Sequence, residues 1–280
     1  MRFDVGCRLA YELWEPATAL FNIRPAATPQ QRIISESLTV TPHADIESMT
    51  IAVTSNRLDR VRMAVGHVRI DYAATVDLEV HTFDPEHVLE RAPSILPMEF
   101  LQDLMPSRYC EADRFSNIAH KLFANSQRGH LRVTEISNWI YDHLDYRRGS
   151  SDAHTSAIDT LTDRAGVCRD FAHVGISLCR ALGIPARFAS AYALGLDPAD
   201  FHAIFEAYLG DRWYLFDPTR QAALDGLVRV GVGRDAAEVA FANFWGGSVT
   251  PVDMQVWIRR SDGVEESGPR TTEAVSVAAT

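Results

Sequence analysis

The first part of the chain alternates apolar and polar residues with a period of two. Such alternation predicts strands that are buried on one face. The pattern runs through residues 3–13 and recurs in short segments up to residue 80, with turn residues between the segments. It changes register at Gly66-His67, which predicts a β-bulge there. We therefore expect an antiparallel β-sandwich over residues 1–83.

The period changes to that of a helix in the second half of the chain. Residues 84–108 hold four prolines and no sustained period, which predicts a linker. Two apolar stripes follow, over 115–123 and 133–144, and each predicts an amphipathic helix. We expect an α+β core over residues 109–262. The small, polar stretch 263–280 is expected to be a flexible tail.

Composition restricts the setting and the partners. The chain has 280 residues and a net charge of -10, without a basic stripe, so we do not expect nucleic acid as a partner. It contains no apolar run long enough for a membrane span and no apolar signal segment near Met1. Its four scattered cysteines do not resemble a disulfide framework. These features predict a reduced, cytoplasmic protein.

Cys168 is placed at the start of a predicted helix. Gly183 and Pro185 end that helix. At a helix N-terminus, free N–H groups and the helix dipole favour an anion, which lowers a thiol pKa. Cys179 should be an inert core residue, because eleven helical residues separate the two thiols by roughly 16 Å. The buried stripe of this helix consists of Phe171, Gly175, Leu178, Cys179 and Leu182.

His202 and Asp217 lie on two strands that the sequence predicts to pair. Gly210-Asp211 is suited to a two-residue hairpin turn. Pairing Leu209 with Arg212 would place His202 diagonal to Asp217 on one face. Diagonal neighbours are roughly 7 to 8 Å apart at the backbone, so the two side chains could hydrogen-bond. A slip of one residue would put them on opposite faces.

These segments together resemble the transglutaminase-like superfamily, in its bacterial branch of cysteine proteases. The resemblance covers about residues 109–219, and the β-rich N-terminal segment resembles the domain that precedes this core in the branch. It implies a papain-like core, a nucleophile helix packed on an antiparallel sheet, and a triad at Cys168, His202 and Asp217. Ile204 departs from the aromatic residue usual at its position, which puts the lining of the cleft in question. The matching motifs are SRYCEAD, TSAIDTL, RAGVCRDFAH, LGIPAR, DFHA and WYLFDPT.

Other polar residues near these motifs have simpler interpretations. His173 and Asp170 lie in the first turns of the helix, and we interpret both as structural. Tyr192, Asp200 and Glu206 are candidates for lining the cleft. No zinc, zincin or EF-hand motif is present in the sequence, so we expect neither a metal nor another cofactor.

The pattern predicts acyl transfer on an amide bond of a peptide or protein, through a thioester on Cys168. A cysteine peptidase or amidase is our first hypothesis, and a protein-glutamine transglutaminase is the alternative because both need the same triad. A noncatalytic scaffold is a further alternative, since each triad residue alone is ordinarily structural. The Cys168 N–H would supply one oxyanion contact, while the second donor is not identified. The sequence does not indicate an oligomer.

Overall fold

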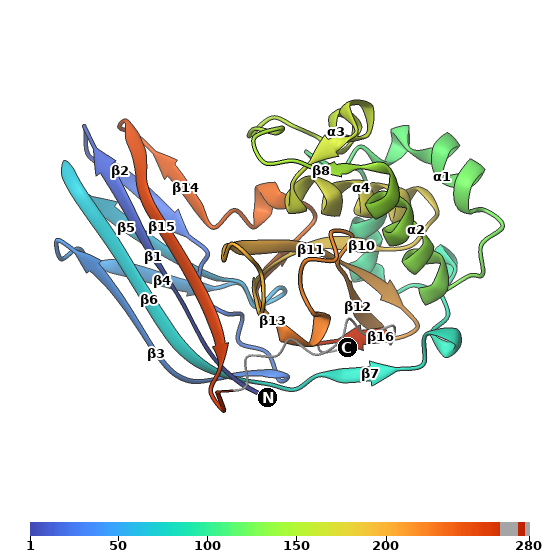
Figure 1. Cartoon of the computed structure of the whole chain (residues 1–280), viewed down its shortest axis with the longest axis horizontal. Coiled ribbons are helices and arrows are strands. Elements are labelled where there is room, and N and C mark those ends of the chain that lie inside the picture. Colours follow the sequence, from blue (N-terminus) through green and yellow to red (C-terminus); the bar gives the residue numbers. More distant parts are fainter. Residues whose placement is uncertain (264–273, 278–280) are drawn as a thin grey trace.

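Two four-stranded antiparallel sheets pack face to face in the N-terminal domain (Figure 1). The computed structural model describes residues 1–263 and 274–277. The strand orders are β15-β1-β6-β3 and β14-β2-β5-β4. The predicted fold class, an antiparallel sandwich followed by an α+β core, is confirmed. The strands are β1 (Arg2–Leu13), β2 (Ala17–Phe21), β3 (Gln31–Thr41), β4 (Ile46–Thr50), β5 (Arg57–Met63), β6 (Gly66–Leu78), β14 (Ala242–Trp245) and β15 (Val249–Arg260).

Strand β6 shows why this segment forms a sheet. Every second side chain along it is buried in the sandwich core, and the residues between are more exposed. The bulge that we expected at Gly66-His67 is wrong. The chain turns there, between β5 and β6, and Gly66 has a φ of 109°, a backbone conformation that favours glycine. The alternate side chains buried on β6 are Val68, Ile70, Tyr72, Ala74, Val76 and Leu78.

The chain returns to the sandwich after the core. Strand β15 pairs along the whole length of β1, from Phe3 with Arg260 to Leu13 with Val249. Strand β14 pairs with β2. The sequence assigned these residues to the core over 109–262, and the strand pairing corrects that boundary. Pairing partners more than two hundred residues apart leave no local signal in the sequence.

The end of the chain also departs from the expected flexible tail. Residues 264–273 and 278–280 lie outside the described residues. Strand β16 (Ala274–Ser276), however, pairs with β7 (His81–Phe83) beside the core sheet. Ala274, Val275 and Val277 are buried there. At least this short apolar segment is therefore part of the folded protein.

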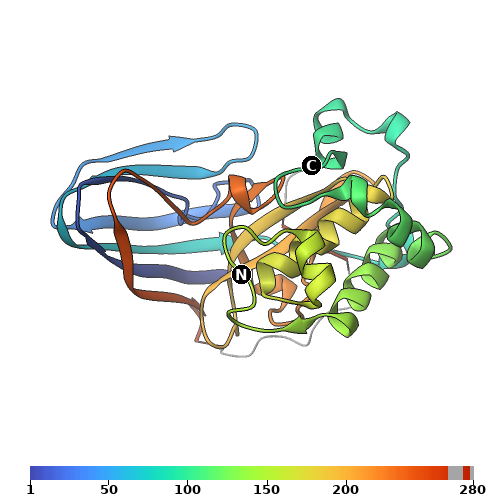
Figure 2. The same cartoon turned by 90° about the horizontal axis from the view of Figure 1, so that it is seen from above.

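The core places one central helix, α4 (Cys168–Ala181), against the antiparallel sheet β12-β11-β10-β13. Helices α1, α2 and α3 contact α4, so that it is enclosed (Figures 1 and 2). A Cβ on Gly175 would lie 2.6 Å from the Phe205 ring, so glycine permits α4 to approach β11 closely. The other elements are α1 (Ser116–Phe123), α2 (His130–His143), α3 (Ala157–Asp163), β8 (Asp145–Tyr146), β9 (Ala165–Gly166), β10 (Ala186–Ala193), β11 (Phe201–Leu209), β12 (Arg212–Phe216) and β13 (Leu227–Gly233).

Short 3-10 helices fill much of the connecting chain. Three of them lie within residues 84–108, the segment expected to be a linker. The last of the three lies against β10 and α4, so this segment packs on the core. The 3-10 helices are Pro85–His87, Pro93–Ile95, Met98–Leu104, Ala112–Arg114, Leu224–Gly226 and Ala236–Glu238.

Hydrogen bonds from buried side chains, two amides and one hydroxyl, join the sandwich to the core. The Asn56 side chain accepts a hydrogen bond from the Val232 N–H at 2.9 Å and donates one to the Val232 carbonyl at 2.8 Å. Gln31 forms the same pair of bonds with the backbone of Arg229. The Tyr192 hydroxyl donates to the carbonyl of Ile23 at 2.7 Å. Since side chains from both domains also share one apolar cluster, the two domains form a continuous body.

Candidate active site

The N-terminus of α4 is fixed by the carboxylate of Asp170. This fully buried group accepts the Val167 N–H at 2.9 Å and a bond from Arg169 Nε at 3.0 Å. A carboxylate in the first turn also interacts favourably with the positive end of the helix dipole. Helix α4 begins at Cys168, as the sequence predicted. Asp170 thereby has the structural role that we expected for it.

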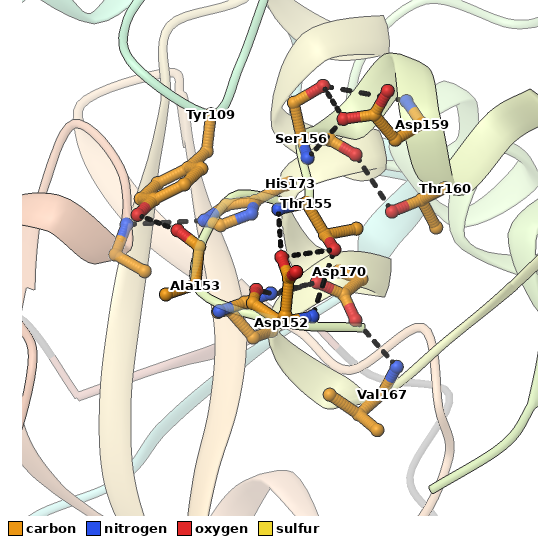
Figure 3. A network of polar contacts seen from close by, with 12 residues as sticks. Tyr109, Asp152, Ala153, Thr155, Ser156, Asp159, Thr160, Val167, Asp170 and His173 are labelled. Carbon is orange, nitrogen blue, oxygen red and sulfur yellow. Dashed lines mark hydrogen bonds and ion pairs between the residues drawn. The ribbon is translucent and has the colours of Figure 1, made fainter. Parts of the chain in front are cut away.

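A polar network holds the loop of residues 152–155, which precedes α3 (Figure 3). Arg169 donates to the carbonyl of Asp152 at 2.6 Å, and Asp152 in turn accepts the N–H groups of His154 and Thr155. A capping box between Ser156 and Asp159 begins α3 directly after this loop. Hydrogen bonds within residues 152–170 therefore fix the path of the backbone that leads to Cys168.

His173 is part of the scaffold behind this network. Its ring stacks on Tyr109 with centroids 5.2 Å apart, and its Nε2 accepts the Ala236 N–H at 3.2 Å. Burial lowers the pKa of His173 to about 3, so the ring is neutral. The Tyr109 hydroxyl donates to the carbonyl of Ala153, which links the scaffold to the loop (Figure 3).

His202 and Asp217 meet through the register that the hairpin turn establishes. Leu209 pairs with Arg212, as predicted. His202 Nε2 then lies 2.9 Å from Asp217 Oδ2, and both side chains are buried. Asp217 also organises the loop that follows it, by accepting bonds from the backbone and hydroxyl of Thr219 and from the N–H groups of Gln221 and Ala222.

The second nitrogen of His202 is available to the thiol of Cys168. Within the described part of the chain, Nδ1 has no hydrogen bond of ordinary geometry. Burial lowers the pKa of His202, but the charge of Asp217, its hydrogen bond to the ring and the neighbouring Cys168 outweigh it and raise the pKa to about 10. Burial raises the pKa of Asp217, whereas the charge of His202 and the hydrogen bonds to the carboxylate lower it, and the net direction is down. The imidazole is thus held between a carboxylate and a thiol.

Cys168 opens into a cavity of about 260 Å³ that His202 also lines. It is half-buried, whereas the other three cysteines are buried. Burial raises the pKa of both Cys7 and Cys110 to about 12, and it also raises the pKa of Cys179, which is a core residue as expected. Further residues that line the cavity are Tyr146, Arg148, Asp200, Phe201 and Gln221.

The structure separates the residues that we expected to line the cleft. Asp200 does line the cavity, and burial raises its pKa. Tyr192 and Glu206 do not line it, which corrects that expectation. Glu206 is four residues beyond His202 on an extended strand, roughly 13 Å away. Ile204 is buried in the core shared with the sandwich, so the departure at this position affects packing.

Sequence reasoning missed Tyr146 and Gln221 at this site. Tyr146 lies on the two-residue strand β8, which is too short to show a period. Gln221 lies in a loop, where no alternation indicates the direction of a side chain. Gln221 follows the WYLFDPT motif by two residues, and this proximity is the sequence signal that could have drawn attention to it.

The described residues contain neither a metal-binding cluster nor a helix that could span a membrane. No group of three or more His, Cys, Asp or Glu side chains within 1–263 and 274–277 is arranged to hold a metal ion. Over the same residues, every helix is too short or too polar to cross a bilayer.

The charge of His202 predicts a pH-dependent stability. Its pKa of about 10 in the folded state exceeds the ordinary value of 6.5, so folding favours the protonated ring. This stabilisation is fully present below pH 6.5 and is lost as the pH rises toward 10. We expect the free energy of unfolding of the wild type, measured in urea, to decline over this range relative to that of His202→Gln. A difference that stayed constant with pH would contradict the raised pKa.

Comparison with known proteins identifies the family and the fold of the chain. A model of the transglutaminase-like superfamily matches residues 116–218, and one of the bacterial transglutaminase N-terminal domain matches residues 1–99. The crystal structure of a putative cysteine protease from Cytophaga hutchinsonii has a TM-score of 0.93 and 39% identity, covering 99% of this chain and 98% of that one. An uncharacterized Mycobacterium leprae protein is 26% identical over 277 residues, covering 92% of this chain and 99% of its own length. The chain therefore belongs to the transglutaminase-like superfamily, a family of thiol-dependent enzymes.

Proposed function

We propose that this protein is a cysteine peptidase or amidase that acts through a Cys168-His202-Asp217 triad. The observation that carries the proposal is the position of His202. One of its nitrogens is bound by Asp217 at 2.9 Å, and the other is left for the only cysteine that lines the cavity in the described part of the chain. A nucleophile, a base and a group that orients the base are what covalent catalysis by a thiol requires.

The reaction follows from this geometry. In the reactive pair the proton of the Cys168 thiol resides on His202, whose raised pKa favours the imidazolium, and the thiolate sulfur attacks the carbonyl carbon of an amide. The C–S bond forms while the carbonyl π electrons move to oxygen. When the carbonyl reforms, the C–N bond breaks and His202 gives its proton to the leaving amine. Water then attacks the thioester carbonyl while His202 takes a proton from it; the C–S bond breaks, the carboxylic acid leaves, and the Cys168–His202 pair is restored with that proton on His202.

Hydrolysis and amine transfer differ only in which nucleophile resolves the thioester. We favour water, because the Cytophaga hutchinsonii protein that shares 39% of its sequence and the whole fold is described as a putative cysteine protease. A primary amine in place of water would make the enzyme a transglutaminase.

A competition between water and an amine tests the proposal. We expect the wild type to cleave amide bonds in a complex peptide library, which mass spectrometry detects as new termini. Added biotin-cadaverine should divert only a minor share of the product, because water resolves most of the thioester. Cys168→Ala is the matched blank for background cleavage.

Two results would contradict hydrolysis in different ways. Cadaverine bound to glutamine side chains, with negligible cleavage, would identify a transglutaminase. No product of either kind, from a protein whose Cys168 reacts with iodoacetamide no faster than a buried cysteine does, would leave only a noncatalytic role.

A further inference from the structure

The carboxylate of Asp217 is oriented by the loop that follows it. Its Oδ1 accepts the N–H of Thr219 at 2.9 Å and the hydroxyl of the same residue at 2.6 Å. Its Oδ2, the oxygen that lies 2.9 Å from His202 Nε2, also accepts the N–H groups of Gln221 and Ala222, both at 3.1 Å. The direction in which the carboxylate faces the imidazole therefore depends on the backbone of this loop.

Arg220 has the backbone conformation on which this arrangement depends. Its N–H donates to the Asp217 carbonyl at 3.1 Å, which closes a turn, and its φ of 55° lies in the left-handed region. A left-handed residue turns the chain so that successive N–H groups can point to one anion, as those of Gln221 and Ala222 do. This conformation is unfavourable for a residue with a Cβ, so other contacts must hold Arg220 in it.

The side chain of Arg220 makes such contacts with helix α2. Its Nη2 donates to Asn138 Oδ1 at 2.6 Å. Its guanidinium carbon lies 4.0 Å from the centroid of the Tyr141 ring, which is a favourable cation–π contact. Asn138 and Tyr141 are spaced i, i+3, so they lie on one face of α2. Because α2 also contacts α4 and β12, the guanidinium ties the loop to the scaffold that carries Cys168.

We propose that Arg220 is a positioning residue, which holds the loop after Asp217 in its left-handed turn through the two contacts with α2 and so directs the carboxylate at His202. This inference rests on the proposed function, in which Asp217 orients the base. Arg220 does not line the cavity of Cys168, so we assign it no contact with the substrate. Alanine at position 220 would keep the unfavourable φ and lose both contacts. The loop should then change its conformation, and the carboxylate should turn away from the imidazole.

The effect should lie in the catalytic step and in its pH dependence. The substrate is a fluorescent peptide synthesised around a site that the wild type cleaves in the peptide library. We expect Arg220→Ala to lower kcat roughly 10- to 100-fold, the scale for a small misplacement of a catalytic group, with KM changed less than about twofold. The decline of kcat at high pH, where His202 loses its proton, should begin about one unit lower, because the imidazolium loses a well-placed carboxylate. A residue that only stabilised the fold would change the melting temperature and neither of these quantities.

Matched variants separate the contacts on α2 from other effects of Arg220. Asn138→Ala combined with Tyr141→Leu removes both contacts but keeps the Arg220 charge, and it should reproduce the loss of kcat. Arg220→Gly should recover kcat to within about threefold of the wild type, because glycine adopts a positive φ without supporting contacts. Arg164→Ala is the control. Arg164 also has a positive φ, 52°, but its exposed side chain has no hydrogen bond or ion pair within the described part of the chain, so kcat should not change.

The outcomes distinguish this inference from the proposed function. A wild-type kcat and pH profile in Arg220→Ala would overturn the inference alone. A double variant on α2 that behaves like the wild type while Arg220→Ala is slow would also overturn it, since the loss would then come from the Arg220 charge. Equal losses in Arg220→Ala and Arg220→Gly would show that the contacts do not act by supporting the left-handed turn, and would overturn it too. A wild type that cleaves no peptide would refute the proposed function, and this inference with it.

Discussion

Replacing Cys168 by alanine is expected to abolish amide cleavage, by more than about 10⁴-fold, the scale on which enzymes with a catalytic triad lose activity when the nucleophile is removed. No other described cysteine can substitute, because Cys7, Cys110 and Cys179 are all buried. The fold should persist. Cys168 is half-buried at the edge of a cavity, so its loss leaves little unfilled space. Steady-state cleavage, the circular dichroism spectrum and the melting temperature measure the two effects separately.

Cys179→Ala is the matched control on the same helix. Its side chain is fully buried, so the substitution should reduce stability by about 1 kcal/mol. It should leave activity at the wild-type level below the melting temperature. Cleavage by Cys168→Ala above the uncatalysed background would show that another group performs the attack, and our assignment of the nucleophile would be wrong.

The sequence contained the central part of the site because its signals are local. The start of α4 at Cys168 follows from helical periodicity and from the stop at Gly183. The meeting of His202 and Asp217 follows from a two-residue turn, which determines the pairing of β11 with β12. Each inference needed fewer than twenty consecutive residues. Whether the three side chains perform catalysis stays a prediction, which the experiments above address.

The sequence could not show what depends on distant pairing. Strand β15 completes a sheet begun by β1, and nothing within residues 249–260 indicates that partner. Glu206 was misjudged for a related reason. The alternation of the strand correctly placed Glu206 on the same face as His202. It did not show which cationic side chains bind Glu206. Arg229 comes from β13, more than twenty residues further along the chain.

Glu206→Ala is expected to reduce the free energy of unfolding by about 3–5 kcal/mol, the usual effect of removing one member of a buried ion pair. Glu206 is fully buried and accepts bonds from Arg187 at 2.6 Å and from Arg229 at 3.0 Å. Arg187 also stacks on Trp213, 3.9 Å from the ring centroid. Without the carboxylate, two guanidinium groups remain in the interior without their anion. Urea unfolding at neutral pH measures the loss.

An exposed glutamate provides the comparison for this variant. Glu47 contacts both Arg60 and Arg62, but its side chain is 52% exposed, so water screens the charges. Glu47→Ala should change stability by no more than the error of the measurement. Equal, small effects of the two substitutions would show that water reaches Glu206, contrary to its burial. Because the cluster joins β10, β11 and β13, its loss should lower the melting temperature while Cys168 keeps its reactivity in the molecules that remain folded.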